Sequence, residues 1–332
     1  MRKSVKNTIL FLILISGLIY LYFNRSYLQA FSNLGLHEII GLLFLSYAGF
    51  LFLGLGFKFI LKIFSLDIPY REWFGLTICN TMFNYYVPAR GGTVAKAYYL
   101  KKKYGFEYPH YVSLMAGSFI ISLVLTSLLG LAAVLLTFIF TGRFILSLAL
   151  VFSLFLVVSL FSGFITRVLS KLTVSTRFER LNLIMENIKD GLTYFSSHKK
   201  ATLNFCIFSV LFILFMILRL YVCFIALDFN VSFMAIALIR LIAEFTFLIS
   251  IVPGNLGIKE GIIVFSASIF EIPLDQAVTA AILDRAVSMF LIFALGFFYS
   301  RGLLGKLAVD EKGTGQESEI PVISENRKGS KY

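Results

Sequence analysis

The sequence predicts an all-α polytopic membrane protein with about six full transmembrane helices and two opposed re-entrant hairpins, arranged like an inverted repeat. Of the 332 residues, 58% are hydrophobic and 14% are charged, whereas soluble domains average roughly 45–50% and about 25%. The apolar residues form about eight or nine separate segments. A soluble chain of this length has too little interior to bury them, so a lipid bilayer is the expected environment.

Six apolar runs are long enough for an α-helix to cross a hydrocarbon core of about 30 Å. These runs cover residues 7–23, 39–63, 111–140, 144–164, 203–227 and 277–299. The first follows Arg2, Lys3 and Lys6 and looks like a secretory signal, but no small-residue cleavage site comes after it. We therefore expect an uncleaved signal anchor, and an integral membrane domain that extends over residues 1–305.

Two further apolar stretches are interrupted by proline and glycine. Residues 72–87 are short for a crossing and run into the motif Pro88–Gly92, whereas residues 233–251 run into Pro253–Gly257 and a second short apolar piece. Proline lacks a backbone donor and glycine permits sharp turns. We expect two hairpins, over residues 72–100 and 233–270, each entering and leaving on one membrane face.

The distribution of Lys and Arg indicates the orientation. If residues 72–100 form a hairpin, most of the 30 basic residues fall on one face, and the opposite connections carry only Arg25 and Arg143. If residues 72–87 crossed fully, Lys101–Lys103 would instead lie opposite the N-terminus. Because basic residues favour the cytoplasmic side, the hairpin is favoured. We expect a multi-pass protein of the cytoplasmic membrane with both termini in the cytoplasm.

The net charge of +12 raises nucleic acid or anionic lipid as a partner. Because the basic residues cluster between apolar runs, we interpret them as a topology signal and expect no nucleic-acid partner. The three cysteines and three histidines lack the spacing of metal ligands, so no metal or other cofactor is expected.

Two segments outside the apolar spans differ from them in composition: one is amphipathic and the other is polar. In residues 165–202 the apolar side chains recur every three or four positions, which predicts a cytoplasmic amphipathic helix in the membrane interface. A helix that docks on a soluble partner is the alternative. Residues 306–332 are rich in Gly, Ser, Glu and Lys, and are expected to form a disordered polar tail.

Charged residues inside apolar segments are candidates for function, because each costs about 2.5–3.5 kcal/mol at mid-bilayer by insertion scales. They are Arg90, Arg219, Arg240, Glu244, Lys259, Glu260, Asp284 and Arg285. Arg240 and Glu244 are four residues apart and are expected to neutralise each other on one helix face. Arg219 receives no role.

Both breaks also leave helix N-termini unsatisfied, and their free N–H groups and dipole favour an anion. Arg90 adds positive charge at the first break, while Glu260 lies where a carboxylate suits the dipole of the helix after the second. We expect the breaks to form a translocation site for an anionic lipid head group. The alternative is that proline and glycine serve only to turn the hairpins. The candidate binding residues are Pro88, Arg90, Gly91, Gly92, Lys96, Arg240, Glu244, Pro253, Gly254, Asn255, Gly257, Glu260, Asp284 and Arg285.

Residues 88–96, followed by Leu100, resemble the first signature of the lysylphosphatidylglycerol synthase transmembrane (flippase-like) family. Residues 253–261 resemble its second signature, and residues 280–295 are also similar to that family. The chain departs from the pattern at Lys96, where the family usually has arginine, and at Thr93, where an acidic residue is common.

The resemblance implies a lipid-translocating membrane domain. The large synthases join this domain to a soluble one that transfers lysine from a charged tRNA to phosphatidylglycerol, and other relatives accompany glycosyltransferases. Neither catalytic domain is expected here, so no catalytic residues are assigned. We expect a flippase or scramblase that moves a polar, anionic lipid or lipid-linked precursor across the cytoplasmic membrane.

Two alternatives remain. One is a non-catalytic membrane partner of a separate lipid-modifying enzyme or glycosyltransferase. The other is a membrane-embedded transferase with Glu260 or Asp284 as the general base.

Overall fold

The computed structural model describes residues 34–87, 90–162, 179–249 and 252–313. Within these ranges the chain is all helical and contains no strand. The expected span 7–23 and the site residue Pro88 lie outside the described residues. The α-helices are α3 (Leu36–Leu61), α4 (Tyr70–Tyr86), α5 (Gly91–Tyr104), α6 (Tyr108–Thr141), α7 (Leu146–Leu160), α9 (Glu179–Ser197), α10 (Lys199–Ile225), α11 (Phe233–Glu244), α12 (Ile258–Ser268) and α13 (Leu274–Gly313).

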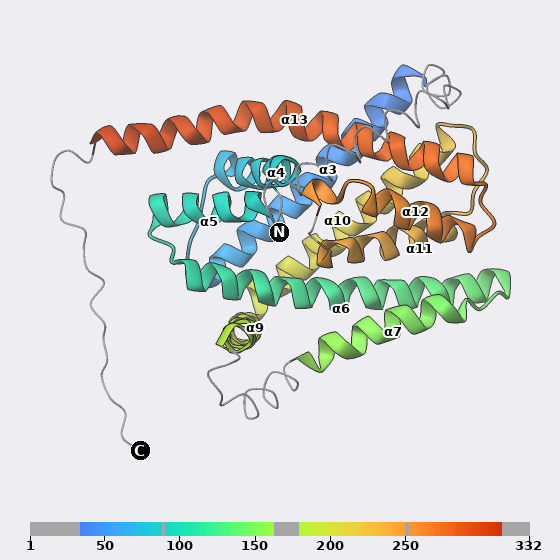
Figure 1. Cartoon of the computed structure of the whole chain (residues 1–332), viewed down its shortest axis with the longest axis horizontal. Coiled ribbons are helices and arrows are strands. Elements are labelled where there is room, and N and C mark those ends of the chain that lie inside the picture. Colours follow the sequence, from blue (N-terminus) through green and yellow to red (C-terminus); the bar gives the residue numbers. More distant parts are fainter. Residues whose placement is uncertain (1–33, 88–89, 163–178, 250–251, 314–332) are drawn as a thin grey trace.

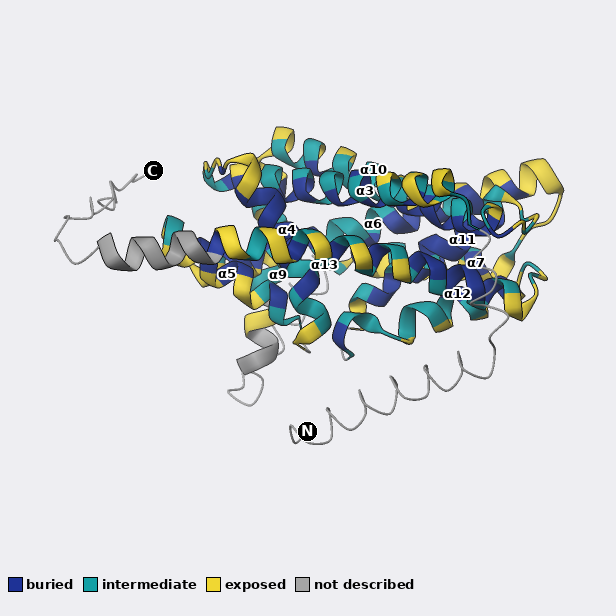
Figure 2. Ribbon diagram, turned by 90° about the horizontal axis from the view of Figure 1, so that it is seen from above, coloured by how far each residue is buried: buried dark blue, intermediate teal, exposed yellow. Residues whose placement is uncertain are grey.

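Four helices are long and apolar enough to cross a membrane: Leu36–Phe64, Tyr108–Thr141, Lys199–Ile225 and Leu274–Leu303. They correspond to four of the expected spans. The expected span 144–164 coincides with α7, which has 15 residues and is shorter than these four. Exposed apolar side chains on the outward faces of α6, α7 and α13, including Leu154 and Phe298, suit contact with lipid tails (Figure 2).

The helix boundaries follow the local sequence. Pro69 precedes α4, and Pro109 lies in the first turn of α6, where a missing backbone donor costs nothing. Gly105 and Gly142 end α5 and α6 in the left-handed conformation, with φ of 66° and 69°. Helix α13 continues to Gly313, so it extends into the tail expected from residue 306, and residues 314–332 lie outside the described part.

Helices α6 and α13 run along the long axis of the molecule, α3 and α10 cross between them obliquely, and two helical hairpins lie among these four helices (Figure 1). Helices α3 and α10 pack along each other, and α13 packs on α4. The pair α4–α5 occupies one end of the bundle and the pair α11–α12 the other. The turn of each pair points toward the middle, where the short 3-10 helix Pro253–Asn255 (η4) contacts α4.

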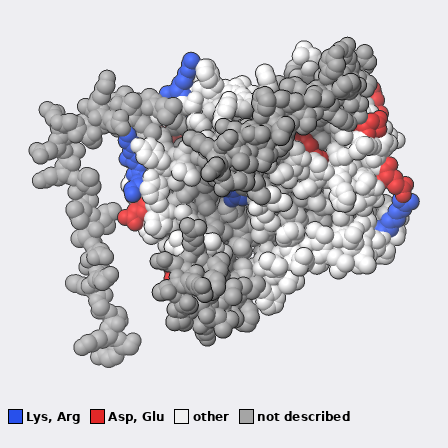
Figure 3. Space-filling model, viewed as in Figure 1, with Lys and Arg blue, Asp and Glu red and all other residues white. Residues whose placement is uncertain are grey.

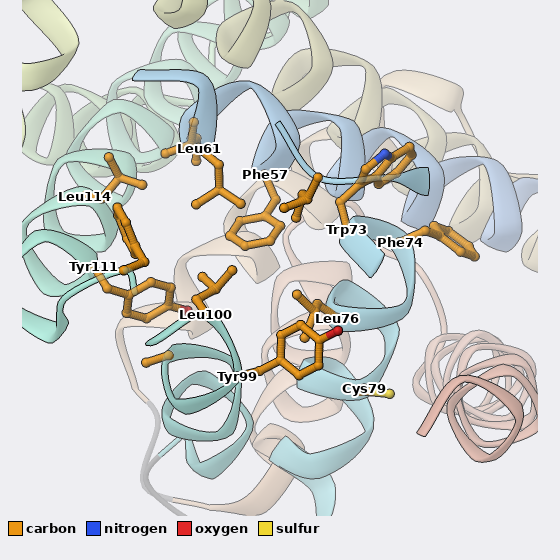
Figure 4. Close-up of a cluster of buried hydrophobic side chains, with 14 of the residues drawn as sticks. Phe57, Leu61, Trp73, Phe74, Leu76, Cys79, Tyr99, Leu100, Tyr111 and Leu114 are labelled. Atoms are coloured by element: carbon orange, nitrogen blue, oxygen red, sulfur yellow. The ribbon is translucent and has the colours of Figure 1, made fainter. Parts of the chain in front are cut away.

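A cluster of buried apolar side chains fixes the position of the first hairpin (Figure 4). Trp73 of α4, Leu100 of α5, Phe57 of α3 and Leu114 of α6 all belong to it. Gly54 of α3 lets the Trp73 ring approach, because a Cβ there would lie 2.8 Å from a ring carbon. The hairpin is thereby held against two of the long helices.

The open end of the first hairpin is fastened by Glu72, whose side chain is almost fully buried in α4. This carboxylate accepts hydrogen bonds from Lys103 Nζ at 2.6 Å, from the Tyr99 hydroxyl at 3.1 Å and from the Tyr104 hydroxyl at 2.5 Å. All three donors belong to α5. A buried charge is stable only when paired in this way, so Glu72 ties α5 to α4 far from the turn.

Helix α9 is seen end-on in Figure 1 while α6 crosses the view, so the two helices cross at a steep angle. The contact is close, because a Cβ at Gly191 would lie 2.1 Å from the Ser113 carbonyl oxygen. Phe195 is buried in the cluster at this end of the bundle. Within the segment 165–202, for which an amphipathic interfacial helix was expected, residues 179–197 form α9, and residues 165–178 lie outside the described part.

Candidate functional site

The two breaks lie at the inner ends of the hairpins and have left-handed backbone. Arg90 has φ of 60° immediately before α5 begins. At the second break, Gly254, Asn255 and Gly257 have φ of 59°, 52° and 79°. A left-handed arginine is energetically unfavourable and uncommon, so the first turn holds Arg90 in a strained conformation.

Two glycines let the halves of the site come close together. A Cβ at Gly92 would lie 2.0 Å from the Asn80 carbonyl oxygen, so α5 packs directly on α4. A Cβ at Gly254 would lie 2.4 Å from the Tyr85 ring, which joins the second break to the first hairpin. These motifs therefore serve packing as well as turning.

The sequence suggested that backbone N–H groups at the N-termini of α5 and α12 would bind an anion. In the structure, side chains of the protein already accept hydrogen bonds from two of these groups. The Gly92 N–H donates to Asn84 Oδ1 at 3.0 Å, and the Gly257 N–H donates to Glu260 Oε2 at 2.9 Å. Thr93 Oγ1 also donates to Asn80 Oδ1 at 3.3 Å. Any anion in this region would therefore be held by basic side chains rather than by these two backbone groups.

A cavity of about 340 Å³ lies between the hairpins and the helices that flank them. All eight charged residues singled out from the apolar segments line it, five basic and three acidic. They come from the first turn and from α10, α11, α12 and α13. The cavity wall therefore carries an excess of two positive charges. Its charged residues are Arg90, Arg219, Arg240, Glu244, Lys259, Glu260, Asp284 and Arg285.

Three ion pairs neutralise part of this charge. Arg219 Nε lies 2.7 Å from Asp284 Oδ1, and its Nη1 donates to Ser46 Oγ at 3.3 Å, which joins α10, α13 and α3. Arg240 Nη2 lies 2.5 Å from Glu244 Oε1, the pair expected from their spacing on α11.

The third pair, Arg285 with Glu260, lies where the two hairpins meet. Arg285 also donates to the Tyr85 hydroxyl at 2.7 Å and to the Asn255 carbonyl oxygen at 3.2 Å. Because Tyr85 belongs to the first hairpin and the other two partners to the second, Arg285 holds both.

A second contact between the hairpins involves Arg90. Its guanidinium donates a hydrogen bond to the Phe247 carbonyl oxygen and lies 4.3 Å from the centroid of the Phe119 ring. A cation above an aromatic face is attracted by the ring. Arg90 thus reaches from the first turn to the second hairpin and to α6.

Of the expected site residues, eight line the cavity. They are Arg90, Arg240, Glu244, Gly254, Asn255, Glu260, Asp284 and Arg285. Gly91, Gly92, Pro253 and Gly257 shape the turns without lining the cavity. Lys96 lies outside the cavity wall, where its Nζ is 3.1 Å from the centroid of the Phe57 ring.

Several residues that line the cavity were not predicted from the sequence. Asn80, Asn84 and Tyr85 lie on one side of α4, at i, i+4 and i+5, and polar residues at that spacing in an apolar helix were the available signal. Lys259 and Arg219 were recognised as buried charges but were not placed in the site.

Comparisons with known proteins place the chain among membrane proteins. The family described as Lysylphosphatidylglycerol synthase TM region matches residues 9–296. A UPF0104 membrane protein of Methanocaldococcus jannaschii is 27% identical over 277 residues, which cover 77% of this chain and 81% of that protein. A UPF0104 membrane protein of Methanothermobacter thermautotrophicus is 29% identical over 146 residues, or 42% of this chain and 43% of that protein. No solved structure matches the chain significantly.

Proposed function

Because the chain belongs to the lysylphosphatidylglycerol synthase TM region family, we propose that it moves a lipid with a polar, anionic head group across the membrane. The observation that carries this proposal is the charged cavity at the meeting point of the two hairpins. Buried ionisable groups in a membrane protein are costly and face a pathway or a partner. Here eight such groups face one cavity.

The hairpins supply the route. We propose that α4–α5 and α11–α12 are re-entrant and enter from opposite membrane faces, so that their turns meet at mid-depth. Irregular backbone at this depth is stable only beside protein or water, and the contacts of Arg90 and Arg285 satisfy the turns from within. The head group would cross through the cavity while its acyl chains remain in lipid.

The contacts of Arg90 and Arg285 between the hairpins act as the closure of this route. A head group that passes must replace the Phe247 carbonyl at Arg90, or the Tyr85 hydroxyl at Arg285, with its own oxygen atoms. Both exchanges leave the arginines hydrogen-bonded. The cost of opening is therefore small compared with the cost of taking a bare charge into hydrocarbon.

The charges at the two ends of the bundle support a cytoplasmic location for the end that holds the C-terminus of α5. Exposed Lys101, Lys102 and Arg71 lie there, whereas Asp228 and Glu271 are exposed at the other end. Figure 3 shows most basic side chains in view toward the first end and most acidic side chains near the second, where a basic side chain also lies. Following the bias of lysine and arginine toward the cytoplasm, we place this chain in the cytoplasmic membrane with the α5 end inward.

The contacts of the carboxylates favour transport over transferase chemistry. Asp284 is held by Arg219, and Glu260 by Arg285 and the Gly257 N–H. A carboxylate stabilised by an arginine is a weak general base. If the purified chain moves no lipid, a role as a non-catalytic partner subunit becomes the favoured function.

The direct test uses purified protein in vesicles of phosphatidylglycerol and phosphatidylcholine that contain a trace of fluorescent phosphatidylglycerol. We expect the protein to make label in the inner leaflet accessible to a reductant added outside, beyond the level in protein-free vesicles. Mass spectrometry of the recovered lipid should show no covalent change. Equal accessibility with and without protein would refute the proposal, and a modified lipid would indicate a transferase.

The proposed topology predicts which engineered cysteines are accessible from outside. In a chain whose cysteines at 79, 206 and 223 are replaced by serine, Lys102→Cys should not react with an impermeant maleimide added to intact cells, whereas Asp275→Cys should. Both positions are exposed in the structure, so lysed cells should label both equally and serve as the control. Labelling of Lys102→Cys from outside would show that α4 crosses the membrane fully.

A further inference from the structure

The walls of the central cavity differ in chemistry. Its charged residues come from the first turn and from α10, α11, α12 and α13, whereas the residues of α4 that line it are all uncharged. These residues, here called the α4 patch, are Asn80, Thr81, Asn84 and Tyr85. Positions i, i+1, i+4 and i+5 of a helix share one face, so the α4 patch is one continuous polar surface without charge.

The two asparagines of the α4 patch each have the oxygen of the side-chain amide already engaged. Asn84 Oδ1 accepts a hydrogen bond from the Gly92 N–H at 3.0 Å, and Asn80 Oδ1 accepts one from the Thr93 hydroxyl at 3.3 Å. Both oxygens therefore bind α5, and each amide nitrogen remains as a donor. Among the described residues, neither nitrogen has an acceptor. The two amide groups are thus available to whatever occupies the cavity.

The two hydroxyl groups of the patch complete this pattern. Thr81 Oγ1 donates to the Thr77 carbonyl oxygen at 2.9 Å, so it can only accept a further hydrogen bond. The Tyr85 hydroxyl accepts a hydrogen bond from Arg285 at 2.7 Å and keeps its own hydrogen for donation. The patch therefore combines neutral donors with a neutral acceptor. A carbonyl or phosphate oxygen only accepts, whereas a hydroxyl group both accepts and donates, so hydroxyl groups match the patch best.

We propose that the α4 patch binds uncharged hydroxyl groups of the lipid head group, so that the protein selects head groups in which a polyol or a sugar is attached to the phosphate. The phosphate then faces the basic side chains across the cavity. A site whose polar groups pair with hydroxyls discriminates against an analogue without them, because its own groups are left unpaired. This inference rests on the proposed lipid transport for the identity of the ligand, but its test measures binding alone.

The test compares two short-chain lipids of equal charge by calorimetric titration of the purified full chain in detergent. Dioctanoyl phosphatidylglycerol and dioctanoyl phosphatidylpropanol are both phosphodiesters with a single negative charge, and their head groups differ only in two hydroxyl groups. Phosphatidylglycerol should bind about tenfold or more tightly. Without recognition of the hydroxyls, the more apolar propyl lipid would bind at least as well. Equal affinities, or tighter binding of phosphatidylpropanol, would overturn the proposal.

A pair of variants separates the donor from the structure of the hairpin. Asn80→Leu removes one amide group of the patch and leaves the charges of the cavity unchanged, so the preference should fall to about threefold or less. The matched control Thr93→Val breaks the same hydrogen bond between α4 and α5 but retains the Asn80 amide, so it should keep the preference. Thermal unfolding followed by the fluorescence of Trp73 checks that both variants fold.

Two results with these variants would contradict the assignment. If both variants lose the preference equally, the packing of α5 on α4 accounts for it. If Asn80→Leu weakens both lipids equally, its amide binds an oxygen that the lipids share, an ester carbonyl or the phosphate. Either result would overturn the binding of hydroxyl groups by the patch. The comparison of the two lipids with the wild-type protein needs no variant, and it decides the proposal even if Asn80→Leu does not fold.

Glycerophosphoglycerol, which has the same head group without acyl chains, distinguishes a lipid from a soluble phosphodiester. It should bind at least about tenfold more weakly than dioctanoyl phosphatidylglycerol, because it lacks the acyl chains. Equal binding would overturn the lipid as the ligand. If the hydroxyl preference is found but vesicles show no lipid movement, the site stands and the transport function fails. If lipid moves without any such preference, the transport function stands and this inference fails.

Discussion

Arg90→Ala is expected to reduce lipid movement in vesicles by roughly tenfold to a hundredfold while leaving the chain folded. The guanidinium is one of the five basic groups that line the cavity, and it donates a hydrogen bond between the hairpins. Hydrogen bonds to charged groups contribute about 1.5–3 kcal/mol, which sets this range for a head group that exchanges onto Arg90. The measurement is the rate at which fluorescent lipid becomes accessible to the reductant.

Folding should survive this change. Arg90 is half-buried beside the cavity, so its removal leaves the Phe247 carbonyl oxygen next to space that water can fill. The control is Arg71→Ala, which removes an exposed arginine at the end of the first hairpin and should move lipid at the wild-type rate. A stable Arg90→Ala protein with normal transport would exclude Arg90 from the route and would strengthen the partner-subunit alternative.

Asp284→Ala is expected to cause the largest loss of stability, about 3–5 kcal/mol, because it leaves Arg219 as an uncompensated buried charge. The two side chains are 6% and 3% exposed, so water cannot take over the role of the carboxylate. Thermal unfolding in detergent, followed by tryptophan fluorescence of Trp73, provides the measurement. Asp275→Ala on the same helix is the matched control, since that carboxylate is exposed.

A neutral double variant tests whether the loss of stability in Asp284→Ala comes from the unpaired charge of Arg219. Arg219→Met/Asp284→Leu removes both charges and fills the space with apolar atoms, and such replacements of buried ion pairs are often neutral or stabilising. We expect the double variant to melt closer to the wild type than Asp284→Ala does. If the double variant melts lower than the single one, Ser46 and the neighbouring groups would have to account for the loss instead.

The membrane class, the family and the all-α fold followed from residues near one another in the chain. Long apolar runs predicted the four long helices, and the Pro-Gly motifs marked where two other apolar stretches break. Arg240 and Glu244 could be paired from sequence because a helix places residues four apart side by side.

The remaining pairs lie far apart in sequence and could not be predicted in this way. Arg219 meets Asp284 only because α10 and α13 pack together, and no local pattern encodes which face each helix turns to the other. The backbone donors expected to be free at the hairpin turns are occupied by side chains. The Gly92 N–H donates to Asn84, which lies across the turn on α4, and the Gly257 N–H donates to Glu260, one turn further along α12. The position of Lys96 outside the cavity could not be predicted either, because its contact with the Phe57 ring depends on how α5 packs against α3.

The dependence of each hairpin on the other has a consequence for the biogenesis of this protein. During synthesis, the first hairpin emerges well before the second, and until then Tyr85 and Arg90 lack the partners that Arg285 and Phe247 later provide. If α4–α5 is re-entrant as proposed, a nascent chain that ends before α11 would therefore hold Arg90 in the bilayer with the Phe119 ring but without the Phe247 carbonyl, and a charge at mid-bilayer costs about 2.5–3.5 kcal/mol. The first hairpin should accordingly settle late, after the C-terminal half has inserted, and an incomplete chain should be a substrate for membrane proteases.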